Sequence, residues 1–467
     1  MKLALPKGPL QDSTADLLES AGLALGDYTQ GSRSYRPQCK SQPDLFTKVF
    51  QERDIAIQVA IGNYDLGVCR LDWVDELLAK YPSDAVVKVR GLGYGRRELH
   101  VVAAESSKLK SLDALSASTD SLRVVSEYPN FAESFALSQR LKRFRIFPVW
   151  GVASGYLPEN AELAIVTASS ASELGKQGLV SLAVLLESSA YLIANRNSLE
   201  GGDLGPVLAA FYSADVSNLA GGEPEAVGEV VGLPPDSGNG QVTLALPDGH
   251  QQKHVVDLLT KAEIGIEGYE LGAPTRRPRI DVQDFAATVT RPQDMPLQVA
   301  NQSFDLAITG RDWLRDHLTR FPSSPVEELL DLEMGRVRIV AVVHNDVPVS
   351  RTAELRSRGR EFALRVASEY VNIADRYAHD NHLAPCKIIP TWGASEAFLP
   401  EDADVLIENT ETGSTIEKNN LKIIDVLFES TACLIANSGS LADSAKRDKI
   451  DRFVRTLRWT LESGPAA

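Results

Sequence analysis

Glu187-Ser188-Ser189-Ala190-Tyr191-Leu192-Ile193-Ala194-Asn195 decides the fold, because Glu429-Ser430-Thr431-Ala432-Cys433-Leu434-Ile435-Ala436-Asn437 repeats it later in the chain. Both versions carry an apolar run of strand length. Other segments recur at nearly the same spacing: Leu3-Ala4-Leu5-Pro6-Lys7-Gly8 as Leu244-Ala245-Leu246-Pro247-Asp248-Gly249, Ser126-Glu127-Tyr128 as Ser368-Glu369-Tyr370, and Trp150-Gly151 as Trp392-Gly393. So many identities at one spacing predict a tandem duplication of a whole domain.

We expect copy one at residues 1–212, a linker rich in glycine and proline at 213–240, and copy two at 241–467. Within copy one, short apolar runs alternate with helical patterns. Strands are expected at Leu3–Leu5, Leu66–Val68, Leu99–Ala103, Leu122–Val125, Leu163–Val166 and Ala190–Ala194, and helices at Leu10–Ala21, Ile55–Ile61 and Phe131–Leu141. Such alternation predicts an α/β fold with mostly parallel sheets. Each copy is long enough for two lobes with a cleft between them.

The bulk properties exclude several classes of protein. A length of 467 residues predicts about two to four domains. The net charge of −15 argues against a nucleic-acid partner held by electrostatics, and no apolar run reaches the ~18 residues of a membrane helix. Pro6 and Gly8 interrupt the start of the chain before a signal-peptide core can form, so we expect a cytoplasmic protein.

Cysteine and histidine spacing predicts neither a metal site nor a disulfide framework. The four cysteines lie far apart without a CxxC pair. His250 and His254, and likewise His379 and His382, can share a helical face, but nothing nearby supplies further ligands. We interpret both pairs as solvated surface.

The chemistry is concentrated after the apolar run Ala403–Ile407, in Glu408-Asn409-Thr410-Glu411-Thr412-Gly413-Ser414-Thr415-Ile416. A strand, a tight Thr-Gly-Ser-Thr turn and a new helix gather N–H groups and hydroxyls, and the helix dipole adds to their attraction for an anion. Glu408 and Glu411 cannot bind phosphate, but they can accept hydrogen bonds from sugar hydroxyls. The stretch therefore predicts a 5-phosphoribosyl pocket. The alternative is a strand-to-helix turn capped by threonine.

Two other loops follow strands, where ligands of α/β folds bind. Lys7 before Gly8 suits a pyrophosphate or triphosphate, although a proline-glycine turn with a solvated lysine has the same pattern. In copy two, Thr309 and Gly310 are small enough for a ligand to approach the backbone. Copy one carries the bulkier Cys69-Arg70 there.

In order along the chain come Ala4-Leu5-Pro6-Lys7-Gly8, Asp65-Leu66-Gly67, Leu92-Gly93-Tyr94-Gly95, Ser126-Glu127-Tyr128-Pro129-Asn130, and an acidic residue with Thr412-Gly413-Ser414-Thr415. This series resembles the catalytic region of the ATP phosphoribosyltransferases of histidine biosynthesis, in the short form without a regulatory domain. The resemblance implies two lobes of the type II periplasmic-binding-protein kind. It also implies an assembly of subunits in which a neighbour can lend an arginine. The implied reaction is attack by N1 of ATP on phosphoribosyl pyrophosphate, with Mg²⁺ on the leaving pyrophosphate.

Both copies depart from this pattern. Copy one has Val166, Ala171 and Glu173 where copy two has the acid, the glycine and the last threonine of the loop. A glutamate in the cradle would repel phosphate, so we expect the copy-one loop not to bind phosphoribosyl pyrophosphate. Copy two keeps the loop, but Asp248 replaces the lysine and Glu408 stands where the family usually has aspartate.

We therefore expect copy two to bind phosphoribosyl pyrophosphate and ATP with Mg²⁺, and the two copies to form an internal pseudo-dimer within a possible larger homo-oligomer. In this hypothesis Gly413, Ser414 and Thr415 hold the 5-phosphate with Thr412, while Glu408 and Glu411 orient the ribose. Further candidates are Arg291, Arg311 and Arg336 for charge neutralisation, Thr309, Gly310 and Glu369 for substrate binding, and Lys7, Arg33 and Arg36 from copy one. One alternative is a non-catalytic paralogue that senses a nucleotide, phosphate or amino acid. A secreted solute-binding protein is disfavoured because no signal segment is recognised.

Overall fold

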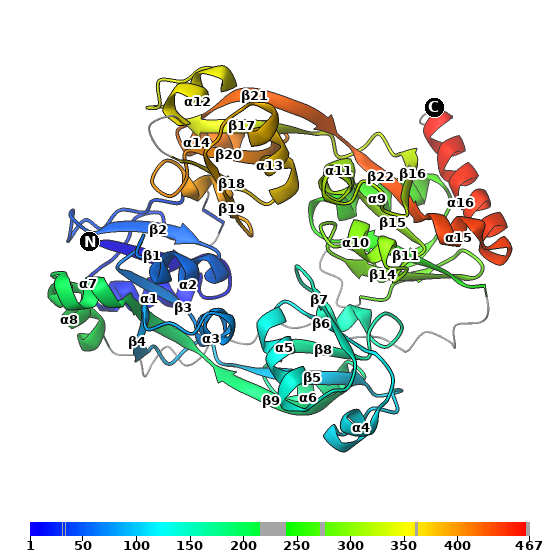
Figure 1. The fold of residues 1–467 in the computed structure, drawn as a ribbon, viewed down its shortest axis with the longest axis horizontal. Helices are drawn as coiled ribbons and strands as arrows, with labels where there is room; N and C mark the ends of the chain where they lie inside the picture. Colours follow the sequence, from blue (N-terminus) through cyan, green and yellow to red (C-terminus); the bar gives the residue numbers. More distant parts are fainter. Residues whose placement is uncertain (30, 33, 215–239, 271–275, 360–362, 464–467) are drawn as a thin grey trace. The chain divides into compact units, whose positions relative to one another are not determined.

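The computed structural model describes residues 1–29, 31, 32, 34–214, 240–270, 276–359 and 363–463. Most of the predicted linker, and Arg33, lie outside these described residues. The described chain forms two compact units (Figure 1). Residues 1–99, 185–214 and 339–427 belong to unit 1, and residues 100–184, 240–338 and 428–463 to unit 2. Each unit thus combines parts of both predicted copies.

Unit 1 contains two five-stranded sheets. Lobe I of copy one (1–99 and 185–214) has the strand order β2-β1-β3-β10-β4, and lobe II of copy two (339–427) has the order β19-β18-β20-β17-β21. The strands are β1 Lys2–Pro6, β2 Phe46–Phe50, β3 Leu66–Arg70, β4 Val86–Gly91, β10 Ala190–Asn195, β17 Val337–His344, β18 Leu364–Ser368, β19 Cys386–Pro390, β20 Val405–Thr410 and β21 Leu421–Ser430. The helices are α1 Gln11–Ser20, α2 Glu52–Ala60, α3 Leu71–Lys80, α7 Arg196–Gly201, α8 Gly205–Ser213, α12 Thr352–Gly359, α13 Val371–Asp380, η2 Ser395–Phe398 and α14 Ser414–Lys418.

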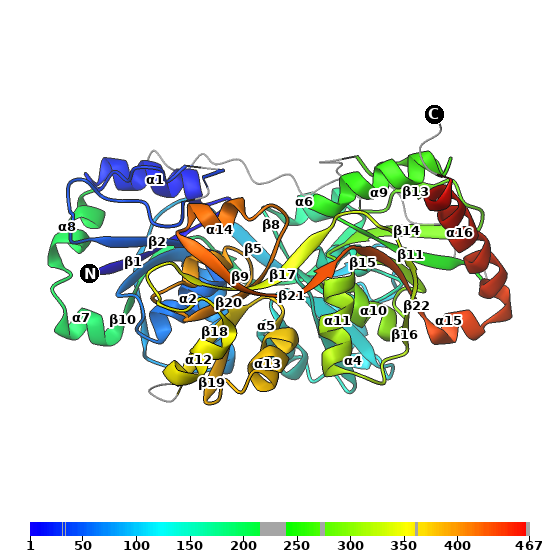
Figure 2. The same ribbon diagram turned by 90° about the horizontal axis from the view of Figure 1, so that it is seen from above.

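Unit 2 repeats this arrangement with the other halves. Lobe I of copy two (240–338 and 428–463) has the order β14-β11-β15-β22-β16 beside a short β12-β13 ribbon, and lobe II of copy one (100–184) has the order β7-β6-β8-β5-β9. The strands are β5 Arg97–Ala104, β6 Leu122–Ser126, β7 Phe144–Pro148, β8 Leu163–Ala168, β9 Leu179–Ser188, β11 Val242–Pro247, β12 Ile266–Glu267, β13 Arg279–Ile280, β14 Phe285–Thr290, β15 Leu306–Gly310, β16 Val326–Asp331 and β22 Ala432–Asn437. The helices are α4 Leu112–Ala117, α5 Pro129–Ser138, η1 Ala153–Tyr156, α6 Ala171–Lys176, α9 His250–Lys261, α10 Met295–Ala300, α11 Arg311–Arg320, α15 Ser438–Ala442 and α16 Ser444–Glu462. Helix α16 packs beside α9 (Figure 2).

The structure confirms the predicted strands and helices of copy one, each displaced at its ends by a few residues. The expectation of mostly parallel sheets is only partly right, and the fold is mixed α/β. In lobe I of copy one, β1 runs parallel to β2 and β3, whereas β10 runs antiparallel to β3 and β4. Strand β10 enters this sheet directly from β9 of the lobe II sheet, with a single residue between the two strands.

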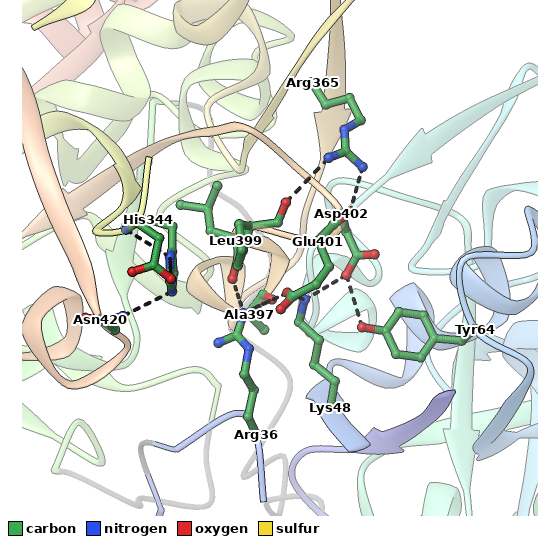
Figure 3. A network of polar contacts seen from close by, with 12 residues as sticks. Arg36, Lys48, Tyr64, His344, Arg365, Ala397, Leu399, Glu401, Asp402 and Asn420 are labelled. Atoms are coloured by element: carbon green, nitrogen blue, oxygen red, sulfur yellow. Dashed lines mark hydrogen bonds and ion pairs between the residues drawn. The ribbon is translucent and has the colours of Figure 1, made fainter. Parts of the chain in front are cut away.

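The two lobes of unit 1 share one apolar core, which runs from the strands of lobe I to η2 and β20 of lobe II. Phe50 of lobe I meets Phe398 of lobe II edge to face, with ring centroids 5.3 Å apart. Arg36 and Lys48 of lobe I form ion pairs with Glu401 of lobe II, at 2.9 and 2.8 Å (Figure 3). Copy-one and copy-two residues are therefore joined by buried contacts inside this unit.

Unit 2 has an equivalent contact between lobe II of copy one and lobe I of copy two. The hydroxyls of Tyr156 and Thr290 lie 2.7 Å apart, and Arg277 forms an ion pair with Glu159 at 2.6 Å. Among the described residues of the whole chain, no helix is both long and apolar enough to cross a membrane.

Candidate active site

The turn predicted to bind phosphate lies between β20 and α14, at the carboxyl end of a buried strand of unit 1. Gly413 has a φ of +83°, which L side chains rarely adopt, so the backbone itself requires glycine here. Its N–H donates to Thr410 Oγ1 at 2.9 Å, and the Ser414 N–H donates to Thr412 Oγ1 at 3.4 Å. Thr412 is exposed, so the turn reaches solvent.

The predicted contribution of the helix dipole needs correction. Helix α14 has five residues and ends at Lys418, so few peptide dipoles are aligned behind the turn. The N–H groups and hydroxyls of the turn itself are the main attraction for an anion.

Glu408 is the buried acid of this site. It is 8% exposed, and its Oε1 accepts a hydrogen bond from the Asn409 N–H at 2.9 Å. Burial raises the pKa of Glu408 well above its usual range, and the carboxylates of Glu369 and Glu396 raise it further. The other predicted acid, Glu411, is exposed on the turn. Glu408, Glu369 and Glu396 together form a carboxylate cluster.

Lys7 of copy one interacts with the carboxylate cluster. Its Nζ donates to the Tyr35 hydroxyl at 3.0 Å and lies 4.8 Å from the centre of that ring. Burial lowers the pKa of Lys7, while the charges of Glu396 and Glu369 act in the opposite direction. A lysine from one copy therefore interacts electrostatically with the carboxylate cluster of the other.

Arg53 and Asp54, at the start of α2 in lobe I, both contact Trp392 of lobe II. The guanidinium of Arg53 lies 4.0 Å from the ring centre of Trp392 and 5.5 Å from that of Trp73. The backbone N–H of Trp392 donates to Asp54, whose pKa is raised well above the usual range by burial. Asp54 Oδ2 is buried and has no hydrogen-bond partner among the described residues.

The equivalent loop of copy one, in unit 2, is occupied by its own side chain. The N–H and the hydroxyl of Ser169 both donate to Glu173 Oε2, at 2.7 and 2.5 Å. Ala171, at the position equivalent to Gly413, is the first residue of α6 and does not have the positive φ of Gly413. The carboxylate of Glu173 thus already occupies both donors of Ser169 in this loop.

Asp248, the counterpart of Lys7, lies in unit 2 between two arginines. It forms ion pairs with Arg276 at 3.4 Å and Arg291 at 3.3 Å. The neighbouring Asp294 accepts a hydrogen bond from the Trp150 N–H at 2.9 Å. Asp248 in place of the lysine and the altered loop of copy one therefore both belong to unit 2.

The other predicted residues of copy two also belong to unit 2, where each is engaged locally. Thr309 donates to the carbonyl of Pro292 at 2.8 Å, and Gly310 directly precedes α11. Arg336 pairs with Glu429 at 3.0 Å, and Arg311 with Asp331 at 3.0 Å. Their part in the site stays a prediction, as does that of Arg33, which lies outside the described residues.

Glu396, Arg53 and Asp54 were missed from the sequence. One signal could have identified Glu396: its counterpart in copy one is Ser154, and this loss of an acid parallels the change from Glu408 to Val166. No such signal marked Asp54, because copy two keeps an acid, Asp294, at the same position.

The described residues contain no group of three or more His, Cys, Asp or Glu side chains that could hold a metal by themselves. The oxygens available are those of the carboxylate cluster. Mg²⁺ binds through one or two carboxylates plus substrate phosphates and water in many phosphoryl-handling sites. The donor set thus fits Mg²⁺ only as an ion that arrives with a pyrophosphate.

The chain resembles known proteins along both halves. A family model described as HisG, ATP phosphoribosyltransferase, matches residues 51–208 and again residues 291–459. An ATP phosphoribosyltransferase of Prosthecochloris aestuarii is 33% identical over 227 residues, which cover 47% of this chain and 71% of the relative. One of Chlorobaculum parvum is 31% identical over 232 residues, covering 48% and 73%. Among solved structures, an ATP phosphoribosyl transferase (HisG:HisZ) complex from Thermotoga maritima is 22% identical with a TM-score of 0.40, covering 48% of this chain and 100% of that one.

Proposed function

The chain belongs to the ATP phosphoribosyltransferase family, and we propose that it transfers the 5-phosphoribosyl group of phosphoribosyl pyrophosphate to N1 of ATP at a single site in unit 1. One observation carries this location. Lys7 of copy one and the turn around Gly413 of copy two, which are the parts that follow the family pattern, belong to the same compact unit. Neither copy is complete alone, but the two complement each other.

In this proposal the turn binds the 5-phosphate. The N–H groups of Gly413 and Ser414 exchange their present partners for phosphate oxygens. The Thr415 N–H and the hydroxyls of Thr412 and Thr415 add further bonds. Glu408, with Glu411, accepts hydrogen bonds from the ribose hydroxyls. Lys7 and Arg53 are the cations of unit 1 that face the pyrophosphate in this proposal.

The reaction forms a bond from N1 to the anomeric carbon as the bond to pyrophosphate breaks. Positive charge develops on the ribose and negative charge on the leaving group, so positioning and charge neutralisation supply most of the catalysis. The carboxyl group of Glu408 would face the ribose, and Lys7 the leaving group. When bound, Mg²⁺ neutralises the pyrophosphate.

The proposal extends to the organisation of the chain. Two matches to one family model and the repeated strand orders of the lobes support a tandem duplication whose copies form an internal pseudo-dimer. A linker at 213–240, a cytoplasmic location and further assembly into a homo-oligomer stay predictions.

Calorimetric binding of phosphoribosyl pyrophosphate tests the turn. We expect Gly413→Glu to abolish binding, because the new carboxylate would repel phosphate and glutamate strains the left-handed φ. The matched control is Ala171→Glu at the equivalent position of copy one, which should leave binding unchanged. Unchanged binding by Gly413→Glu would remove the turn from the mechanism.

Steady-state release of pyrophosphate from ATP and phosphoribosyl pyrophosphate tests the activity separately. Turnover that depends on both substrates and on Mg²⁺ is the expected result. Tight binding of phosphoribosyl pyrophosphate without any turnover would instead identify a sensing paralogue.

A further inference from the structure

The contact between the two lobes of unit 1 contains a charged group that is completely buried. The side chain of Lys48 is 0% exposed, and its Nζ donates to Asp402 Oδ2 at 2.8 Å (Figure 3). The Tyr64 hydroxyl donates to the same oxygen at 3.2 Å. Lys48 and Tyr64 come from lobe I of copy one, and Asp402 comes from lobe II of copy two.

The counterparts of these residues in unit 2 are uncharged. Ala4 of β1 pairs with Lys48 in its sheet, and the repeated Ala245 of β11 pairs with Thr288, so Thr288 takes the place of Lys48. In the repeated segments, Phe304 takes the place of Tyr64 and Asn160 that of Asp402. The charge pair is thus present in one unit and replaced by neutral residues in the other.

A second contact is common to both units and cannot distinguish them. Arg36 forms an ion pair with Glu401 and donates to the carbonyl of Leu399. Arg277 does the same with Glu159 and the carbonyl of Leu157. These arginines favour packing of any lobe I on any lobe II, whichever copy each comes from.

We infer that the Lys48–Asp402 pair determines which lobes pack together, namely lobe I of copy one with lobe II of copy two. If each copy packed on itself, Lys48 would face Asn160 but would keep an ion-pair partner in Glu159, the counterpart of Glu401. Asp402 would face Thr288 and Phe304 and would be buried without a cation, which is strongly unfavourable. Only the arrangement of the structure pairs Asp402 with a lysine. If the proposed function is right, this selection also brings Lys7 to the turn at Gly413.

Cross-linking of the full-length chain tests the inference without any activity measurement. Cys386, the half-buried native cysteine, is first replaced by serine. Arg277→Cys with Glu159→Cys reports the observed packing, and Arg36→Cys with Glu159→Cys reports packing of copy one on itself. Each pair is treated with a short bis-maleimide, and the linked peptides are quantified by mass spectrometry. In the otherwise unchanged chain we expect only the first reporter to cross-link.

Moving the lysine from copy one to copy two should change which lobes pack together. With Lys48→Thr and Thr288→Lys, the partner of Asp402 lies on copy two, so the first cross-link should fall and the second should rise at least tenfold. With Lys48→Thr and Asp402→Asn, neither packing buries an unpaired charge, and both reporters should cross-link. If the first reporter alone cross-links in either variant, the charge pair does not select the packing. Loss of both cross-links in the neutral variant would equally overturn the inference, because that chain would then need the pair to assemble at all.

Discussion

At the scale of single residues, Glu408 belongs to the proposed site and also affects the stability of unit 1. A carboxyl group whose pKa is raised in the folded state is held in its protonated form, so its contribution is fully present below the unfolded pKa of about 4.3. As the pH rises through the folded pKa, ionisation in a buried position next to Glu369 and Glu396 removes that contribution. We expect Glu408→Gln to match the unchanged protein at pH 4 and to melt a few degrees higher near pH 8. Thermal melts over this pH range give the measurement.

The control for this prediction is Glu411→Gln, which removes a carboxylate from the exposed side of the same turn. It should leave the pH dependence of the melting temperature unchanged. A difference between Glu408→Gln and the unchanged protein that stays constant with pH would contradict the explanation from burial. Loss of turnover in the more stable Glu408→Gln protein would mark Glu408 as a residue kept for function at the expense of stability.

At the scale of elements, the turn between β20 and α14 depends on one backbone conformation. A Cβ on Gly413 would meet no atom within 4 Å, so Gly413→Ala changes the backbone preference without a clash. The left-handed φ should cost about 1 kcal/mol of stability. It should also weaken binding of phosphoribosyl pyrophosphate about tenfold, because the amides no longer hold their geometry. Urea unfolding and calorimetry measure the two effects, with Ser414→Ala as the control that keeps the turn. Equal binding by Gly413→Ala and the unchanged protein would show that the turn tolerates another conformation.

The same element shows what could be predicted from sequence and why. The turn, its acid and the expectation that the copy-one loop does not bind phosphate follow from local chemistry, since Gly413 and Glu173 act within a few residues of their own positions. The composite of Lys7 with the carboxylate cluster depends instead on which lobes pack together. That choice is made by side chains such as Lys48 and Asp402, which lie far apart in the chain and fall in no motif. Arg53 was missed for the same reason, because its role depends on Trp392 of the other copy.

At the scale of the whole molecule, the difference between the two units predicts one working site for each chain. Unit 1 contains Lys7, the carboxylate cluster and the turn at Gly413. Unit 2 contains Asp248 and the loop in which Glu173 accepts hydrogen bonds from Ser169. Calorimetry should therefore find one molecule of phosphoribosyl pyrophosphate bound to each chain. Lys7→Asp, which places the copy-two residue in unit 1, should lower kcat/KM at least a hundredfold, equivalent to about 2.7 kcal/mol of transition-state stabilisation.

The reciprocal change, Asp248→Lys, is the matched control for this asymmetry. It restores the lysine of the family pattern to copy two, but in unit 2, where Glu173 still occupies the donors of Ser169. It should therefore neither raise the number of bound molecules nor rescue Lys7→Asp when the two changes are combined. Rescue by Asp248→Lys would mean that the lysine acts with the turn of its own copy, and the site would then have to be assigned to copy two alone.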